Sequence, residues 1–367
     1  MRIMLTGGGT GGHIYPALAF AKYLKQVEPD LEILYVGTEK GLESKIVPAE
    51  GYNFKTIDIQ GLRRSLSLDN IKTAFKFLSS ISKAKKIIKE FNPDLILGTG
   101  GYVSAPIVYA GTKLNIATII HEQNAVSGLA NKFLAKKVSA VTVAFHHAED
   151  QFPKEKVSFV GNPRAQEVAD TKSSDILKSY KLDPGKKTVL IFGGSRGALT
   201  INQAVVAALP ELAKEEFQVL YASGEAYYED FKEIFESYAD SETISIRPYI
   251  SNLSELLSSV SLIVGRSGAT TIAEITAIGI PAIFIPSPNV TNDQQTKNAS
   301  ELVENGAAVL IKDEELNAEK LIQTISEILS NEVKYKGMKQ ASKEAGVPDA
   351  SERLYKIAKK LINERRV

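Results

Sequence analysis

The chain has 367 residues, of which 44% are hydrophobic and 24% are charged, and its formal net charge at pH 7 is +1. This length favours two domains, and the composition is that of an ordinary globular protein rather than a disordered or fibrous one. Cysteine is absent, which excludes a disulfide framework and thiolate metal sites.

Short apolar runs alternate with helical patterns along the whole chain. Strands are expected in the first half at residues 3–5, 33–36, 95–97, 117–120, 140–143 and 158–160. In the second half they are expected at 189–192, 218–222, 244–246, 262–264, 282–285 and 307–310. Helices are expected at 16–27, 70–90, 200–212, 270–277 and 350–365. This order predicts an α/β protein of two Rossmann-like domains with parallel sheets.

The domain boundary is expected at the turn-rich segment 161–164, which follows a predicted strand. The first domain then covers residues 1–163, and we expect the last helix, within residues 349–367, to join it. The second domain covers residues 164–348. Each domain has a glycine turn after its first strand and another after a later strand.

These four glycine turns are residues 7–12, 98–101, 193–197 and 265–268. Glycine lets the backbone curl tightly and approach a ligand closely. A helix that starts there directs free N–H groups at a phosphate. Because ligands of open parallel sheets bind outside the carboxyl ends of the strands, the turns predict two phosphate-bearing substrates in a cleft between the domains.

The first turn also matches the dinucleotide fingerprint, Gly7-x-Gly9-x-x-Gly12, with Glu39 after the next strand. An NAD-dependent oxidoreductase is therefore an alternative, but it leaves the glycine turns of the second domain unexplained. A non-catalytic sugar-nucleotide-binding protein, such as an epimerase-like remnant or a regulator, is a third possibility. The interpretation with two phosphate-bearing substrates requires no cofactor. A metal ion is not indicated either, because the histidines and acidic residues lack the spacing of metal ligands.

Three polar segments are candidate binding sites. Glu274 lies in an apolar helical stretch, where it could accept hydrogen bonds from a ribose, or it could simply be an exposed helical glutamate. Gln294 and Gln295 could bind sugar hydroxyls or cap a helix. Residues 121–124 follow a strand, which indicates either a binding site or a structural turn.

Charge is uneven along the chain. Residues 1–164 hold 21 Lys and Arg against 14 Asp and Glu, a net charge of +7, and the remainder carries −6. In the helix expected at 70–90, Ile71, Phe75 and Leu78 share one face. Lysines surround that face: Lys72, Lys76, Lys83, Lys85, Lys86 and Lys89. Such a helix is typical of an anionic membrane surface as partner, although its apolar face could instead pack on the sheet. We expect no nucleic-acid partner.

Together these motifs resemble the MurG-type family of peptidoglycan N-acetylglucosaminyltransferases. They run in order over nearly the whole chain, at residues 7–13, 98–104, 121–124, 161–163, 193–197, 266–271 and 293–295. The resemblance implies a GT-B fold and inverting, metal-independent transfer of N-acetylglucosamine from UDP-N-acetylglucosamine (UDP-GlcNAc). The acceptor would be the C4 hydroxyl of MurNAc in undecaprenyl-diphospho-MurNAc-pentapeptide (lipid I), which gives lipid II for the cell wall. It also implies a peripheral location at the cytoplasmic face of the cell membrane, with cell-wall synthesis proteins as further candidate partners.

The resemblance also implies roles for individual residues. Donor contacts in the second domain would be Ser195, Ile250, Ala269, Thr270, Thr271, Glu274, Gln294 and Gln295. Donor contacts in the first domain would be Thr10, Gly11, Gly12 and Asn124. The acceptor diphosphate would lie against Gly9, Gly100, Gly101 and Tyr102. Some family members contact the donor with an arginine two residues after the Asn-Pro pair. Here that place holds Ala165, so Arg164 is the candidate.

His13 is the candidate general base that deprotonates the acceptor hydroxyl. A helix N-terminus disfavours the imidazolium, so the ring stays neutral and able to accept a proton. Alternatively, His13 binds a diphosphate or caps the helix, and Glu122 or His121 is the base.

Overall fold

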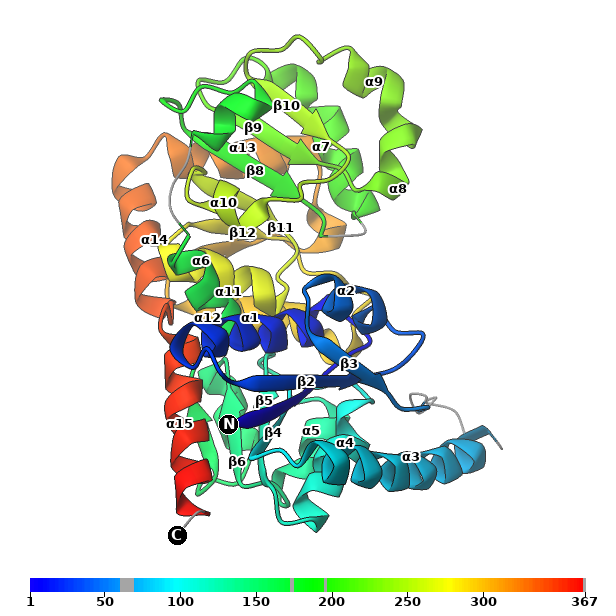
Figure 1. Cartoon of the computed structure of the whole chain (residues 1–367). Helices are drawn as coiled ribbons and strands as arrows, with labels where there is room; N and C mark the ends of the chain where they lie inside the picture. The colour runs from blue at the N-terminus through cyan, green and yellow to red at the C-terminus, as the bar shows by residue number, and fades with distance from the viewer. Residues whose placement is uncertain (60–68, 172–174, 195–196, 366–367) are drawn as a thin grey trace. The chain divides into compact units, whose positions relative to one another are not determined.

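The chain divides into two compact units in the computed structural model (Figure 1). Unit 1 comprises Met1–Glu167 together with Asp349–Val367, and unit 2 comprises Val168–Pro348. The structure describes residues 1–59, 69–171, 175–194 and 197–365, with residues 69–75 described by their backbone alone. Each unit is treated by itself below.

Unit 1 is built on a parallel sheet of seven strands in the order β3-β2-β1-β4-β5-β6-β7. The strands are β1 (Arg2–Thr6), β2 (Glu32–Gly37), β3 (Asn53–Thr56), β4 (Leu95–Gly98), β5 (Ala117–Glu122), β6 (Ala140–Val143) and β7 (Val157–Phe159). Alternate side chains of β1 enter two cores, Met4 on one face of the sheet and Ile3 and Leu5 on the other. Both faces are therefore buried, as expected for a parallel sheet.

Helices cover these two faces. They are α1 (Gly11–Val27), α2 (Glu43–Ala49), α3 (Asp69–Phe91), α4 (Ser104–Lys113), α5 (Leu129–Ala135) and α15 (Ala350–Glu364), with the short 3₁₀ helix η1 (His146–Gln151). Helix α6 (Pro163–Ala169) contains the boundary between the two units along the chain. Helix α15 contacts α1 (Figure 1). Its Leu354, Ala358 and Ile362 recur at helical spacing and enter the same core as α1, which fixes the end of the chain to unit 1.

Unit 2 repeats this plan with a parallel sheet of six strands in the order β10-β9-β8-β11-β12-β13. The strands are β8 (Thr188–Phe192), β9 (Gln218–Ala222), β10 (Ile244–Arg247), β11 (Leu262–Gly265), β12 (Ala282–Phe284) and β13 (Ala308–Leu310). The α-helices are α7 (Leu199–Leu212), α8 (Glu225–Tyr228), α9 (Lys232–Glu236), α10 (Leu253–Leu257), α11 (Ala269–Ile278), α12 (Gln294–Glu304), α13 (Ala318–Leu329) and α14 (Glu332–Ala345). The 3₁₀ helices are η2 (Ile176–Tyr180), η3 (Glu229–Phe231), η4 (Thr291–Asp293) and η5 (Asp313–Glu315).

The predicted α/β fold with two Rossmann-like parallel sheets is confirmed. Two details differ from the expectation. Helix α1 begins at Gly11 rather than at residue 16, because Thr10 is extended and the glycines are accepted in the first turn. Strand β3 was not predicted, since its residues alternate between exposed and half-buried and form no apolar run.

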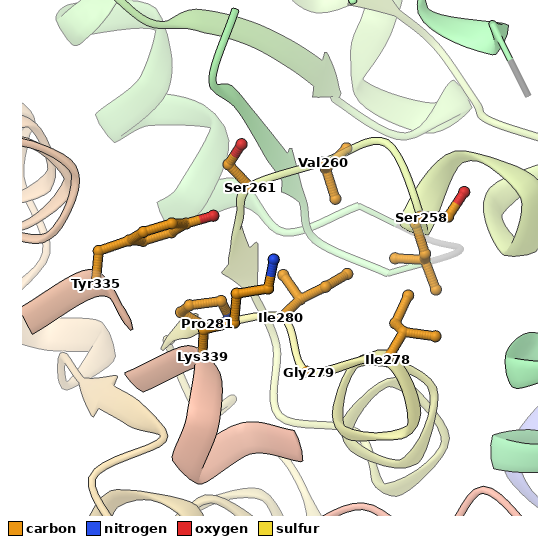
Figure 2. Close-up of a pocket in the computed structure, with 10 residues that line it drawn as sticks. Ser258, Val260, Ser261, Ile278, Gly279, Ile280, Pro281, Tyr335 and Lys339 are labelled. Carbon is orange, nitrogen blue, oxygen red and sulfur yellow. The ribbon is translucent and has the colours of Figure 1, made fainter. Parts of the chain in front are cut away.

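A pocket of about 220 Å³ lies in unit 2 at the amino ends of β11 and β12 (Figure 2). Val260 and Pro281 line it from the segments that precede these strands, and Tyr335 and Lys339 line it from α14. Ligands of parallel sheets bind at the opposite, carboxyl edge. The pocket is therefore separate from the glycine turns and is not part of the candidate site.

Candidate functional site

The strand order reverses once in each unit. Strand β1 pairs with both β2 and β4, and β8 pairs with both β9 and β11. The connections on the two sides of such a point run over opposite faces of the sheet, which leaves a crevice at the carboxyl ends of the two central strands. The four glycine turns follow those four strands, β1, β4, β8 and β11. Each unit therefore has two glycine turns at its topological switch point.

The two turns of unit 1 touch one another through their backbones. The amide of Gly8 donates to the carbonyl oxygen of Gly100 over 3.3 Å. A Cβ on Gly101 would lie 2.3 Å from the Gly8 oxygen, and Gly101 has a φ of +79°. Glycine is therefore required at this position both for space and for conformation.

His13 lies in the first turn of α1 with its ring against the second glycine turn. Its Nδ1 is 2.9 Å from the carbonyl oxygen of Gly8 and 3.3 Å from Oγ1 of Thr10. Because a carbonyl oxygen only accepts hydrogen bonds, Nδ1 is the donor, and in the neutral ring Nε2 would hold the lone pair. A Cβ on Gly100 would come within 3.1 Å of Nε2, so this glycine makes room for the ring.

Gly9 differs from the expectation for an acceptor diphosphate ligand. Its N–H donates to Oε2 of Glu43 over 3.1 Å, so this donor is already occupied by a carboxylate. Glu43 was not a candidate from the sequence. The other residues expected at the acceptor diphosphate, Gly100, Gly101 and Tyr102, lie together in the turn between β4 and α4, and the Tyr102 side chain is exposed.

Glu122 ends strand β5, and its carboxylate is fully engaged by its own loop. Its Oε1 accepts from the backbone and side-chain amides of Asn124 over 3.1 and 3.3 Å. Its Oε2 accepts from the amide of Gly128 and from Nδ2 of Asn131, both over 2.9 Å. A buried carboxylate with four donors organises a turn and cannot approach an acceptor hydroxyl. The structure therefore opposes the alternative that Glu122 is the base, and it supports the structural-turn alternative for this segment.

His121 is also unsuited to be the base. The side chain is fully buried within β5, where Nδ1 lies 3.0 Å from Oγ1 of Thr142. Burial lowers the pKa of His121 to about 3, because desolvation disfavours the charged ring. A general base works best with a pKa near the operating pH. Of the three candidate bases, His13 is the one that is not buried.

Most of the candidate donor residues of unit 2 lie in α11 and at the start of α12. Ala269, Thr270 and Thr271 form the first turn of α11, and Glu274 lies farther along the helix and is buried. Gln294 and Gln295 begin α12, and both are half-buried. Ile250 is buried in the segment after β10. Ser195 lies outside the described residues, so its predicted role stays a prediction.

Side-chain to backbone hydrogen bonds join these two helix starts. Oγ of Ser267 donates to the carbonyl oxygen of Gln295 over 2.8 Å. Oε1 of Gln295 accepts from the amide of Ser287 over 2.8 Å. The side-chain oxygen of Gln295 is thus engaged within the protein, so the group that Gln295 could offer to a sugar hydroxyl is the NH₂ of Nε2.

Arg266 braces the same region. Its guanidinium donates to the carbonyl oxygens of Ile285 and Pro286, to Oγ1 of Thr200 and to the carboxylate of Asp313. These partners come from the ends of β12 and from the starts of α7 and η5. The arginine therefore has a structural role between neighbouring loops of unit 2.

Arg164, the candidate donor contact, is engaged within unit 1. Its Nη1 donates to the Glu167 carboxylate, and its guanidinium lies 5.7 Å from the centre of the Tyr15 ring. The side chain is only 16% exposed. A structural role for Arg164 explains these contacts without a donor.

The burial of His121 predicts a pH dependence of stability. A histidine in the unfolded chain titrates near pH 6.5, well above the folded value of about 3. The unfolded state thus binds more protons between these values, so this contribution is complete above pH 6.5 and is lost as the pH falls. We expect His121 alone to lower the free energy of unfolding by up to ~1.4 kcal/mol per pH unit below pH 6, measured by urea denaturation.

His121→Asn should abolish this part of the slope. His146→Asn, at an exposed histidine of the same unit, serves as the matched control and should keep it. An identical slope in the His121→Asn variant and in the wild type would show that folding does not lower the pKa of His121.

Comparisons with known proteins identify both halves of the chain. Residues 3–143 match the glycosyltransferase family 28 N-terminal domain, and residues 188–354 match the family 28 C-terminal domain. The chain is 61% identical, over 99% of its length and 100% of the relative, to the UDP-N-acetylglucosamine--N-acetylmuramyl-(pentapeptide) pyrophosphoryl-undecaprenol N-acetylglucosamine transferase of Lactococcus lactis subsp. cremoris (strain MG1363). The protein of the same name from Bacillus licheniformis is 52% identical over 98% of this chain and 99% of the relative.

Two solved structures extend the comparison. The crystal structure of Acinetobacter baumannii MurG has a TM-score of 0.77 and 28% identity, and covers 98% of this chain and 99% of that one. A putative UDP-N-acetylglucosamine 2-epimerase from Listeria monocytogenes has a TM-score of 0.73 at 17% identity, over 99% of this chain and 97% of that one, which is a likeness of fold alone. The resemblance inferred from the motifs is confirmed, and the chain belongs to glycosyltransferase family 28.

Proposed function

We propose that this enzyme transfers N-acetylglucosamine from UDP-GlcNAc to the C4 hydroxyl of MurNAc in lipid I, which gives lipid II. The observation that carries the proposal is the 61% identity, over 99% of the chain, to a transferase named for this reaction. Two glycine turns at the switch point of each unit suit a reaction in which both substrates carry a diphosphate. The relatives named above are transferases, so nothing supports the oxidoreductase alternative.

Unit 2 would bind the donor. The start of α11 presents N–H groups that a helix cannot pair internally, and these suit the UDP diphosphate. Glu274 would accept hydrogen bonds from the ribose hydroxyls, and the backbone of Ile250 would contact uracil. Gln294 and Gln295 would bind the sugar hydroxyls. Thr10, Gly11, Gly12 and Asn124 of unit 1 would contact the sugar as well.

Unit 1 would bind the acceptor and supply the base. The acceptor oxygen attacks the anomeric carbon from the face opposite UDP, so the configuration inverts. As the new C–O bond forms, the hydroxyl proton passes to Nε2 of His13, and the bond to UDP breaks with its electron pair on the diphosphate. Nε2 can take this proton because Nδ1 already holds one against Gly8. Helix N-termini stabilise the charge that develops on UDP.

Glu274→Gln should weaken donor binding. Hydrogen bonds between a charged group and a buried partner contribute ~1.5–3 kcal/mol, so we expect the Kd for UDP to rise about tenfold or more. Isothermal titration calorimetry measures the change. Glu319→Gln, an exposed glutamate in the first turn of α13, is the matched control and should leave the Kd unchanged. Unaltered UDP affinity in a folded Glu274→Gln variant would remove Glu274 from the donor site.

His13→Asn should lower turnover with the acceptor while leaving UDP affinity intact. Removal of a general base typically costs ~10²–10⁴ in rate. UDP release with a soluble lipid I analogue measures kcat, and His146→Asn should retain wild-type turnover. Near-normal kcat in the His13→Asn variant would make His13 a structural residue.

We propose that α3 forms the contact with the membrane surface. The inner face of this helix packs on the sheet through Ile81, Ile87 and Ile88. On the outer side, Leu78 is 63% exposed. Lysines on that side are exposed as well: Lys83, Lys86 and Lys89. The side chains of Ile71, Lys72 and Phe75 lie outside the described part of the chain.

None of the described helices is long and apolar enough to cross a membrane. The proposed location is peripheral, at the cytoplasmic face of the cell membrane, where lipid I is anchored.

Replacing Lys83, Lys86 and Lys89 by Glu should strongly reduce sedimentation with phosphatidylglycerol vesicles. Each lysine near an anionic surface contributes ~1 kcal/mol, and salt screens this attraction over ~8 Å at physiological strength. Lys154, Lys186 and Lys320 are exposed lysines elsewhere in the chain, and their replacement by Glu is the matched control for net charge. If the two triple variants bind vesicles equally, α3 does not form the membrane contact.

A further inference from the structure

Glu43, the first residue of α2, is fully buried beneath the first glycine turn. Its Oε1 accepts from the amide of Thr38 over 3.0 Å and from the Thr38 hydroxyl over 2.7 Å. Its Oε2 accepts from the amide of Gly9 over 3.1 Å. Burying a carboxylate is costly unless donors satisfy it, and here three donors from two segments converge on it.

Three glycines make room for this carboxylate. A Cβ on Gly8 or Gly37 would lie 2.5 Å from atoms of Glu43, and a Cβ on Gly41 would lie 2.2 Å from its Oε1. These glycines come from the first glycine turn, the end of β2 and the segment just before α2. The backbone around Glu43 is therefore shaped to admit this side chain.

Glu43 and His13 bond to opposite edges of a single peptide group. The N–H of Gly9 donates to Glu43, and the carbonyl of Gly8, which belongs to the same peptide, accepts from Nδ1 of His13 over 2.9 Å. In a trans peptide these two groups point in opposite directions. Hydrogen bonds at the two ends of one peptide polarise each other, so each strengthens the other.

We propose that Glu43 is a positioning residue for His13 that acts through the Gly8–Gly9 peptide. The carboxylate fixes the plane of this peptide, so that the Gly8 oxygen faces Nδ1 of His13. Nδ1 then keeps the ring proton, and Nε2 is left to accept another. This inference rests on the proposed function for the role of His13 as base, but the arrangement of the ring proton can be tested without any reaction.

The first test measures the ring proton in the wild-type protein. The chain contains four histidines, so ¹⁵N-histidine labelling gives a simple spectrum, and His13→Gln assigns the His13 signals. At a pH where the ring is neutral, we expect His13 to be protonated on Nδ1 and unprotonated on Nε2. A neutral ring with its proton on Nε2 would overturn the proposal, whatever the variants do.

The second test uses Glu43→Gln, which keeps the shape but presents an amide in place of one oxygen. We expect the Nε2-protonated form of His13 to appear and kcat to fall about 10–100-fold, as when an outer partner that orients a functional histidine is lost. UDP affinity, carried by unit 2, should be unchanged. Thr38→Val is the matched control, because it removes a donor to the same carboxylate but leaves the bond to Gly9, and it should keep the wild-type ring.

The outcomes separate the possible explanations. Lower kcat with an unchanged His13 ring would reduce Glu43 to a structural residue and overturn the proposal, and so would wild-type kcat with an unchanged ring. If Glu43→Gln does not fold, the wild-type spectrum still decides. If the wild-type enzyme failed to transfer N-acetylglucosamine, the proposed function would fall while the ring measurement would still stand or fall by itself.

Discussion

The reversal of strand order between β1 and β4, and again between β8 and β11, determines where each unit can bind an anion. Only there do the connections leave a sheet on opposite faces, and only there can two neighbouring turns both offer backbone N–H groups to one ligand. Under the proposed function, much of the anion site would therefore be backbone. This fits the structural use of Arg266, whose guanidinium is occupied by protein oxygens from adjoining loops.

The sequence predicted the sheets well because nearly all of the strands are buried on both faces. Such strands appear in the sequence as unbroken apolar runs, and the runs at β8 and β11 clearly predict buried strands. Strand β3 was not predicted, because it lies at the edge of its sheet and its exposed residues alternate with half-buried ones. The start of α1 was placed too late because glycine is a poor helix former, so Gly11 and Gly12 did not indicate the first turn of a helix.

The candidate site was predicted less evenly, since a polar residue at a strand end can face a ligand or its own loop. Residues 121–124 were marked either as a binding site or as a structural turn, and in the structure four donors from the following loop converge on Glu122. Glu43 gave no local signal, as it is far from Gly9 along the chain. The one available sign was the spacing of Gly37 and Gly41 before it, and their meaning depends on packing in three dimensions.

The first turn of unit 1 has the glycine spacing of the dinucleotide fingerprint, but the backbone amides of Gly8 and Gly9 are not the free hydrogen-bond donors of that fingerprint. In that fingerprint the glycines let the backbone amides approach a pyrophosphate. Here the amide of Gly8 is bonded to Gly100 and that of Gly9 to Glu43, a carboxylate that would repel a pyrophosphate at the same place. The turn instead holds an imidazole by its Nδ1. Under the proposed function, the same glycine spacing would position a histidine, and the acceptor phosphates would bind the later amides at the starts of α1 and α4.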